Sequence, residues 1–253
     1  MCEVRSMPTP SEAGQASRLS LHGKQDSLGG CPTIASEGAL RWRWLAAAFT
    51  YPDEETWTWL QSSVAAVCDR RPEMSALIER RYSLEEIQSA YLAIFGHTVK
   101  SDCPPHEIEY GELKADPLFQ PHRLADIAAF YNAFGLEVAP DADERVDHIA
   151  MECEFYAVLC AKEEVAGDNR ELCLDAQRKF LREHLARWTP AFTRRLERLA
   201  GDSFYPAAAG QLRAAVEAEC ARHGLQPGNA DLQLRPVEEL VDPCGACGLV
   251  QKE

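Results

Sequence analysis

The sequence predicts an all-α protein, and two observations carry that prediction. Through most of residues 37–225, apolar side chains recur at spacings of three and four, which is the period of a helix with one buried face. Helix-starting signals stand where this period begins: Ser83 with Glu86, and Asp168 with Glu171, have the spacing of a capping box. No segment shows the apolar–polar alternation of a convincing strand. We therefore expect one helical domain over residues 37–225.

Three helices are expected in the first part of this domain. The first, residues 37–52, has tryptophan, leucine and alanine on one face and ends at a proline, and the second, residues 53–69, keeps tryptophan, leucine and valine in register. The third follows the Ser83 cap and ends at residue 95. Residues 96–120 contain two adjacent prolines and several acids but show no period, so we expect a long irregular loop. Loops of this length inside a domain often carry function.

Five further helices are expected after the loop, over residues 121–134, 143–166, 168–188, 189–199 and 204–223. The helix over 143–166 has two apolar faces, which indicates that other elements cover it on most sides. Thr189 followed by Pro190 is typical of a helix start, because threonine caps the first turn and proline fits its first position.

Both ends of the chain are expected to lie outside the helical domain. Residues 1–36 are rich in Ser, Gly, Pro and Gln and have no apolar period, which predicts a disordered leader. Residues 226–253 are rich in Gly, Pro and acids, which predicts an irregular tail.

Composition limits the classes of function. With 26 basic and 40 acidic residues the formal net charge is −14, which argues against nucleic acid as the main partner and favours basic ligands or peptide segments. No apolar run approaches the roughly 20 residues that span a bilayer, and the first residues lack a signal-peptide pattern. We therefore expect a cytoplasmic protein without stable membrane insertion, whose ten cysteines are mostly reduced.

A group of polar side chains stands at the start of the helix expected over residues 143–166. Asp147 and His148 are adjacent, and Glu144, His148 and Glu152 are spaced four apart, so a helix would place these three in a row. Polar groups beside a core are costly to bury, which favours a binding role for them. Two other interpretations stay open: an ordinary surface ladder contributing about 0.2–0.5 kcal/mol per pair, or half of a metal site.

A second group of residues, which could bind a metal or form a disulfide, lies in the tail. Cys244 and Cys247 form a C-x-x-C-G sequence, of the kind found in zinc and rubredoxin-type knuckles. Cys103 and His106 have the same two-residue gap and lie in the long loop, so the four side chains would complete a tetrahedral zinc or iron site. The alternatives are a thiol–disulfide pair, or a reduced and unstructured tail that holds no cofactor.

Four segments, taken in order, resemble a known family. They are Tyr51-Pro52, the run Tyr91–Gly96, the pair Asp147-His148 and the run Phe180–Trp188, which reads FLREHLARW. Together they look like the TorD/DmsD/NarJ family of molybdoenzyme-specific chaperones, also called redox enzyme maturation proteins. The loop run CPPHEIEYG, residues 103–111, is similar to the branch that serves selenate, chlorate, dimethylsulfide and ethylbenzene oxidoreductases.

The resemblance implies a TorD-like helical bundle with a non-enzymatic role. Such proteins bind the apo catalytic subunit of a molybdopterin oxidoreductase, often with its twin-arginine signal peptide, and assist cofactor insertion before export. A twin-arginine signal joins a basic start to an apolar stretch, so its receptor needs an apolar groove with acidic groups at one end. Carboxylates suit this task because a guanidinium can pair with one through two parallel hydrogen bonds.

The resemblance also implies where a client would bind. The family's motif region maps onto Asp147 and His148, and the neighbouring Glu144 and Glu152 would add to the acidic end of the groove. The loop side chains expected to contact the client are Pro104, Pro105, Glu107, Glu109 and Tyr110. We expect the chaperone to be a monomer or a dimer. The alternatives are a metal- or thiol-dependent redox protein built on the C-x-x-C of the tail, and a helical scaffold with no role in maturation.

Overall fold

The computed structural model describes the helical domain and one short segment of the leader. The described residues are 19–21, 37–67, 82–96, 101–111, 119–139, 142 and 144–235. Helices dominate them, which confirms the all-α prediction, and one pair of three-residue strands is the exception. Within these residues no helix is long and apolar enough to cross a membrane.

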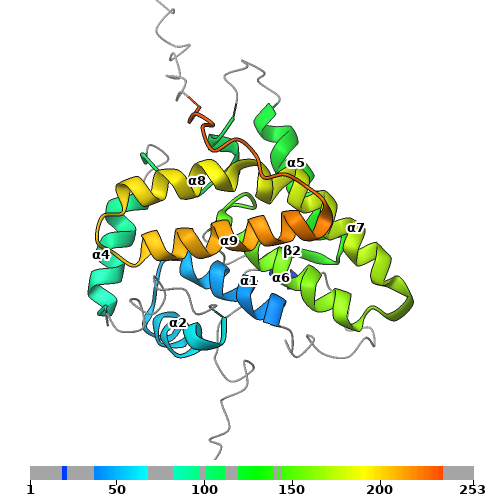
Figure 1. Cartoon of the computed structure of the whole chain (residues 1–253), viewed down its shortest axis with the longest axis horizontal. Coiled ribbons are helices and arrows are strands. Elements are labelled where there is room, and N and C mark those ends of the chain that lie inside the picture. Colours follow the sequence, from blue (N-terminus) through cyan, green and yellow to red (C-terminus); the bar gives the residue numbers. More distant parts are fainter. Residues whose placement is uncertain are drawn as a thin grey trace, which may run out of the picture.

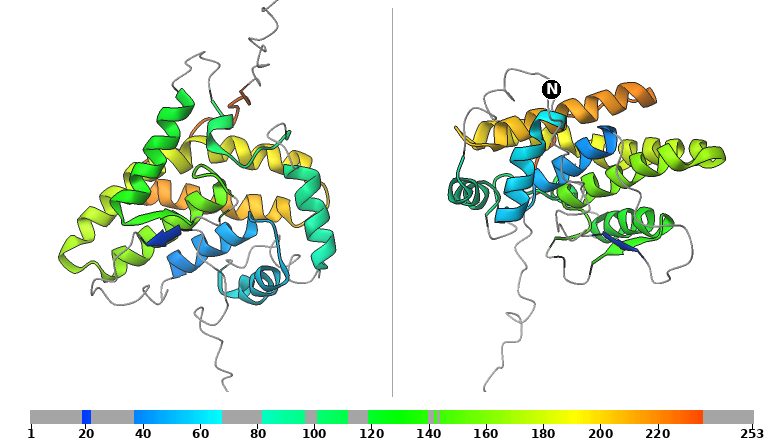
Figure 2. Two further views of the ribbon diagram at one scale, coloured as in Figure 1. Left: turned by 180° about the vertical axis from the view of Figure 1, so that it is seen from behind. Right: turned by 90° about the horizontal axis from the view of Figure 1, so that it is seen from below.

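The helices are arranged in layers around a central pair (Figure 1). α1 (Glu37–Ala48) and α6 (Ile149–Val165) form the most extensive contact between any two described elements. The antiparallel helices α8 (Ala186–Leu199) and α9 (Tyr205–His223) lie on one side of this pair, and α5 (Phe119–Ala133) lies with the strands on the other (Figure 2). The central pair is therefore covered from both sides.

Three further helices lie at the edges of these layers. α2 (Glu54–Val67) packs on α1. α7 (Arg170–Phe180) packs on α6 after the 3-10 turn η2 (Gly167–Asn169). α4 (Leu84–Phe95) stands beside the turn that joins α8 to α9 (Figure 1).

The start of α4 and the burial of α6 agree with the sequence prediction. The Ser83 hydroxyl accepts a hydrogen bond from the Glu86 N–H at 3.2 Å, and the Glu86 carboxylate accepts one from the Ser83 N–H at 2.7 Å, so the capping box forms. In α6, 12 of 17 residues are buried, because α1, α7 and one strand cover its apolar faces. The packing of α1 on α6 includes Trp42 and Tyr156, whose ring centroids are 4.6 Å apart.

The paired strands correct the prediction that the chain has no strand. β1 (Leu19–Leu21) pairs antiparallel with β2 (Leu136–Val138), with Leu19 opposite Val138. Leu19 is buried, so this part of the leader is joined to the domain, while the rest of residues 1–36 lies outside the described chain. Strands of three residues are too short to show a convincing alternation, which is why the sequence did not reveal them.

The helix boundary predicted at Thr189 and Pro190 is wrong. α7, the π-helical turn η3 (Leu181–Leu185) and α8 follow one another without interruption, and Pro190 lies inside α8. Proline has no N–H, so the carbonyl of Ala186 lacks its usual helical donor. The N–H of Gly228 donates to that carbonyl at 2.7 Å instead, and the helix continues.

The start of α7 also differs from the prediction. Asp168 and Glu171 have the spacing of a capping box, but η2 occupies this stretch. The residue before α7 is Asn169, whose side chain makes no capping hydrogen bond. The 3-10 turn follows Ala166 directly, and it moves the first α-helical residue to Arg170.

Candidate functional site

α6 begins later than predicted, and its first turn is held by the loop over residues 101–111. The helix starts at Ile149, and the Nδ1 atom of His148 accepts a hydrogen bond from the Ala150 N–H at 3.1 Å, so His148 caps it. The Ile149 N–H donates to the Pro105 carbonyl at 2.9 Å. Cap and loop together satisfy N–H groups that the start of a helix leaves open.

The predicted row of Glu144, His148 and Glu152 on one helix face is therefore wrong. Glu144 and His148 precede the first helical residue, and Glu152 alone lies within α6. The chain before the helix turns over residues 145–148, where the His148 N–H donates to the Arg145 carbonyl at 3.0 Å. The loop holds this turn, because the Glu107 N–H donates to the Asp147 carbonyl at 3.0 Å. The two regions that the sequence singled out, the loop and the start of this helix, thus form one unit.

The carboxylate of Glu107 is the centre of a buried charge cluster. Its exposed fraction is 0%, and its Oε1 atom accepts hydrogen bonds from Arg187 Nη2 at 2.8 Å and Nε at 3.1 Å. Arg123 donates to the same oxygen, and His184 Nδ1 lies 2.9 Å from Oε2. Burial raises the pKa of Glu107, but the His184 hydrogen bond and the guanidinium charges outweigh burial and lower it to about 2.

Two separate parts of the chain bring the partners of Glu107 together. Arg123 comes from α5, whereas His184 lies in η3 and Arg187 in the first turn of α8. The Nε2 atom of His184 lies 3.3 Å from Oδ2 of Asp126 on α5, so the imidazole ring bridges two carboxylates. π-helical turns are frequent at functional sites, and this one directs the His184 side chain toward the loop.

Asp147, the residue expected to anchor a client arginine, is paired within the chain. The exposed fraction of its side chain is 0%, and Arg145 donates to it from Nε at 2.9 Å and from Nη2 at 2.8 Å. The Ile108 N–H also donates to its Oδ2 at 3.3 Å. The two parallel hydrogen bonds expected from a client guanidinium are therefore made by an arginine of this chain.

Glu152 and His148 are buried as well. The Trp188 Nε1–H donates to the Glu152 carboxyl at 3.2 Å. Burial, and then the nearby charge of Glu107, raise the pKa of Glu152 well above its usual value, which favours the neutral form of this carboxyl. The His148 ring packs edge-on against the His106 ring, with centroids 5.1 Å apart. These groups face the interior of the protein and present no charge to solvent.

The loop residues expected to meet a client are mostly buried as well: Pro104, Pro105, Glu107 and Tyr110. Glu109 and Glu144 are half-buried and keep part of their surface exposed. Asp147 and His148 lie at the start of α6, as expected, but the loop encloses both side chains. The part that any of these residues takes in client binding stays a prediction.

Sequence reasoning missed the basic members of the cluster: Arg123, Arg145, His184 and Arg187. For two of them a signal existed. In the run FLREHLARW, His184 and Arg187 are three residues apart among apolar side chains, so a helix places them on one face beside the core. Polar residues in such a position usually have a buried partner.

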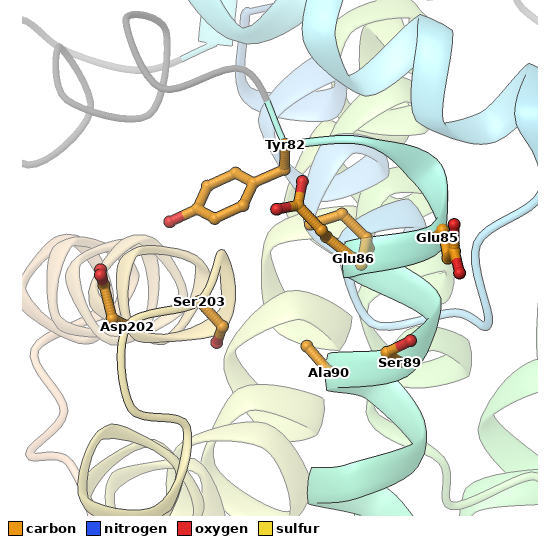
Figure 3. A pocket seen from close by; sticks show the side chains of 8 residues that line it. Tyr82, Glu85, Glu86, Ser89, Ala90, Asp202 and Ser203 are labelled. Carbon is orange, nitrogen blue, oxygen red and sulfur yellow. The ribbon is translucent and has the colours of Figure 1, made fainter.

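A separate hollow lies between α4 and the turn that joins α8 to α9 (Figure 3). Its volume is about 380 Å³, and its lining residues are Tyr82, Glu85, Glu86, Ile87, Ser89, Ala90, Asp202 and Ser203. The Tyr82 ring extends from the α4 side toward the α8–α9 turn, and carboxylates stand on both sides of the hollow. A hollow with an aromatic wall and acidic groups suits a cationic side chain on an apolar stem. Its two walls are distant in the sequence, so no local pattern predicted it.

Comparison with known proteins places the chain in a family. The family described as nitrate reductase delta subunit matches residues 54–194, which is more than half of the chain. The chain belongs to this family. The match contains the loop, the start of α6 and the buried charge cluster, so the site lies within the part of the chain that is common to the family.

Relatives of this family member are named as chaperones. The selenate reductase assembly chaperone protein of Thauera selenatis is 32% identical over 193 residues, covering 75% of this chain and 91% of the relative. The chlorate reductase assembly chaperone protein of Ideonella dechloratans is 30% identical over 188 residues, covering 72% and 88%. Chaperone protein TorD of Photobacterium profundum is 26% identical over 154 residues, covering 60% and 70%. These names confirm the resemblance to the TorD/DmsD/NarJ family, and they confirm a chaperone in place of an enzyme.

The tetrahedral metal site predicted for this chaperone stays a prediction. Cys244 and Cys247 lie outside the described residues. Burial raises the pKa of Cys103 to about 12 and lowers that of His106 to about 4, so both side chains are neutral at pH 7. A metal at Cys103 would have to displace a proton from a buried thiol. Within the described residues no group of three or more His, Cys, Asp or Glu side chains could hold a metal ion.

A metal site shared by loop and tail has a measurable consequence. Protein purified without chelator should contain about one equivalent of zinc or iron, and Cys247→Ser should release it. Elemental analysis and thiol titration of the two proteins measure this. Cys173→Ser is the control, since Cys173 is a buried thiol of α7 outside both motifs. Metal-free wild-type protein with freely titrating thiols would contradict the site and leave a reduced tail.

Proposed function

We propose that this chain is a cytoplasmic chaperone that binds the apo catalytic subunit of a molybdopterin oxidoreductase, together with its twin-arginine leader, and assists cofactor insertion before export. One observation carries the proposal. The likeness to the selenate and chlorate reductase assembly chaperones extends over 91% and 88% of those proteins. A chain that is similar to two assembly chaperones over nearly their whole length fits a client of the same kind, the catalytic subunit of a reductase.

The geometry of the charge cluster favours binding over chemistry. The carboxyl groups of Glu107, Asp147 and Glu152 are buried, and arginine or tryptophan side chains of this chain hold them. General acid–base catalysis needs a group within hydrogen-bond reach of the substrate, which these groups are not placed to provide. Buried polar networks of this kind rigidify the structure around them. Here the network fixes the loop against α5, α6 and α8, which offers a client a preformed surface.

The acidic hollow beside α4 is a better place for the basic start of a leader than Asp147. Glu85 and Asp202 on its two sides are exposed, whereas Asp147 is enclosed. A guanidinium that enters the hollow could pair with a carboxylate and lie against the Tyr82 ring. The apolar stretch that follows the arginines would then continue over the surface beyond the hollow.

Co-expression tests the function. A tagged chaperone should co-purify with the catalytic subunit of a selenate- or chlorate-type reductase, and the captured subunit should lack molybdopterin. Calorimetry with a synthetic leader peptide then tests the hollow: Glu85→Gln with Asp202→Asn should weaken binding about two- to thirtyfold, because exposed charge pairs contribute ~0.2–1 kcal/mol each.

The matched control is Asp168→Asn with Glu171→Gln, which removes the same charge from exposed positions in η2 and α7. It should bind the leader as the wild type does. Unchanged leader affinity of Glu85→Gln with Asp202→Asn would contradict only the proposal that the leader binds in the hollow. Failure to retain any such catalytic subunit, with or without its leader, would contradict the function.

A further inference from the structure

The last segment that the structure describes, residues 229–235, ends beside the loop over residues 101–111 and is here called the strap. It begins with a turn, in which the Leu232 N–H donates to the Asn229 carbonyl at 3.3 Å, and beyond this turn Leu234 pairs antiparallel with Tyr110 in one bridge. The Gly111 N–H donates to the Gln233 carbonyl at 3.2 Å, and the Arg235 N–H donates to the Glu109 carbonyl at 2.8 Å. Main-chain groups make both contacts. Peptides that add to an exposed strand are held by main-chain contacts of the same kind.

The chain is anchored to α8 at Gly228, directly before the strap. The Gly228 N–H donates to the Ala186 carbonyl that Pro190 leaves without a helical partner, at 2.7 Å. A Cβ atom at this position would lie 2.3 Å from the Arg187 carbonyl oxygen, so glycine is required for the close approach. Beyond this point the strap contributes an ion pair to Arg194, whose side chain and that of its partner are both more than half exposed. Exposed pairs of this kind hold weakly.

The side chains of the strap define what the edge accepts. Leu232 and Leu234 are half-buried against the core, and the residues before and between them are exposed, which is the alternation of a strand with one inward face. After them, the Arg235 guanidinium lies over Gly111, where an added Cβ would be 3.2 Å from its Nη2 atom. Its charge also acts on the half-buried Glu109. The pattern is apolar, polar, apolar, basic.

We propose that the loop edge Glu109–Gly111 is a binding surface for an extended peptide of this pattern, and that the strap occupies it as an internal ligand. The peptide pairs with the Gly111 N–H and the Glu109 carbonyl while the strap swings away beyond Gly228. The edge selects two apolar side chains at alternate positions followed by an arginine. The proposal rests on the proposed function, since it takes the peptide from a client polypeptide.

The test uses the full chain and a fluorescent peptide with the sequence of residues 229–235, NADLQLR. Arg235→Pro removes the N–H that pairs with Glu109 and the guanidinium, so it should free the edge. If the strap fills the edge about nine-tenths of the time, the variant should bind the peptide about tenfold more tightly than the wild type. Gln233→Ala is the control: it keeps the carbonyl that accepts from Gly111 and changes an exposed side chain, so its affinity should match the wild type.

Hydrogen exchange of the wild type gives a second measurement that needs no variant. Excess peptide should speed exchange of the Arg235 N–H, while the Gly111 N–H stays protected because the peptide carbonyl replaces that of Gln233. Equal peptide affinity of Arg235→Pro and wild type, or unchanged exchange of Arg235, would overturn the proposal. Dimers of Arg235→Pro in place of peptide binding would overturn it too, in favour of strap exchange between copies. Retention of the client subunit is measured separately. A protein that retains its client but does not bind NADLQLR would contradict the peptide-binding role of the loop edge and leave the proposed chaperone function intact.

Discussion

Replacing Glu107 with alanine should lower the free energy of unfolding by about 3–5 kcal/mol, because the change leaves the partly buried guanidinium groups of Arg123 and Arg187 without their buried partner. In the folded chain Arg123 and Arg187 both donate to this carboxylate, whose exposed fraction is 0%. His184 would lose its partner at 2.9 Å as well. Urea denaturation followed by circular dichroism measures the loss.

The matched control is Glu109→Ala, which removes a half-buried glutamate two residues further along the same loop. Its carboxylate lies 3.7 Å from Arg145 Nη2, and Arg145 keeps its two bonds to Asp147. We expect this control to cost about 1 kcal/mol or less. Equal losses of unfolding free energy in the two variants would show that the buried cluster stabilises the fold no more than the half-buried Glu109 does.

The pH dependence of stability separates Glu107 from Glu152. Glu107 has a folded pKa of about 2 against an ordinary value of 4.5, so its stabilisation is present above pH 4.5 and is lost as pH falls toward 2. Glu152 has the opposite sign: its folded pKa is raised, so stability falls as pH rises above 4.5 and the unfolded chain releases the proton. Glu107→Ala should therefore flatten the acid side of the curve. Because the charge of Glu107 also contributes to the raised pKa of Glu152, the variant should lose less stability than the wild type on the alkaline side.

Local patterns predicted those parts of the fold that are decided locally. The capping box of α4 joins residues three apart, and the apolar faces of α6 follow a period that one helix displays by itself. Boundaries set by distant partners could not be predicted in this way. α6 begins at Ile149 because Pro105 accepts its N–H, and α8 continues through Pro190 because Gly228 supplies a donor. Neither partner is adjacent in the sequence.

The sequence pointed to the loop and to the start of α6 as candidate regions, and the structure joins the two but buries most of their polar side chains. The resemblance pointed to Asp147 and to the loop, and the structure joins them through the Glu107 N–H. An acid in an irregular segment is normally solvated, so nothing in the sequence showed that Asp147 and Glu107 are enclosed. Their arginine partners lie at spacings that no short motif encodes, apart from Arg145 two residues before Asp147.

Because Asp147 is enclosed, the double substitution Asp147→Ala with His148→Ala should destabilise the protein by ~2–4 kcal/mol. The estimate combines about 1 kcal/mol for the lost helix cap with about 1–3 kcal/mol for hydrogen-bond donors left without an acceptor. His148 accepts from Ala150 at 3.1 Å, and Asp147 accepts from Ile108 at 3.3 Å. Thermal and urea unfolding measure the change. An unfolding free energy equal to that of the wild type would contradict the enclosed position.

Loss of client binding in that variant would not by itself show that Asp147 touches the client, since a weakened fold also binds less. Arg145→Ala separates the two roles. If Asp147 serves the fold, removing its bidentate partner should destabilise the chain, and a double-mutant cycle of Arg145 and Asp147 should show coupling above about 0.5 kcal/mol. If Asp147 is instead the anchor for client arginines, Arg145→Ala frees the carboxylate and should raise affinity for the leader peptide. We expect coupling in stability and no gain in leader affinity, because the loop still encloses Asp147 when Arg145 is replaced by alanine.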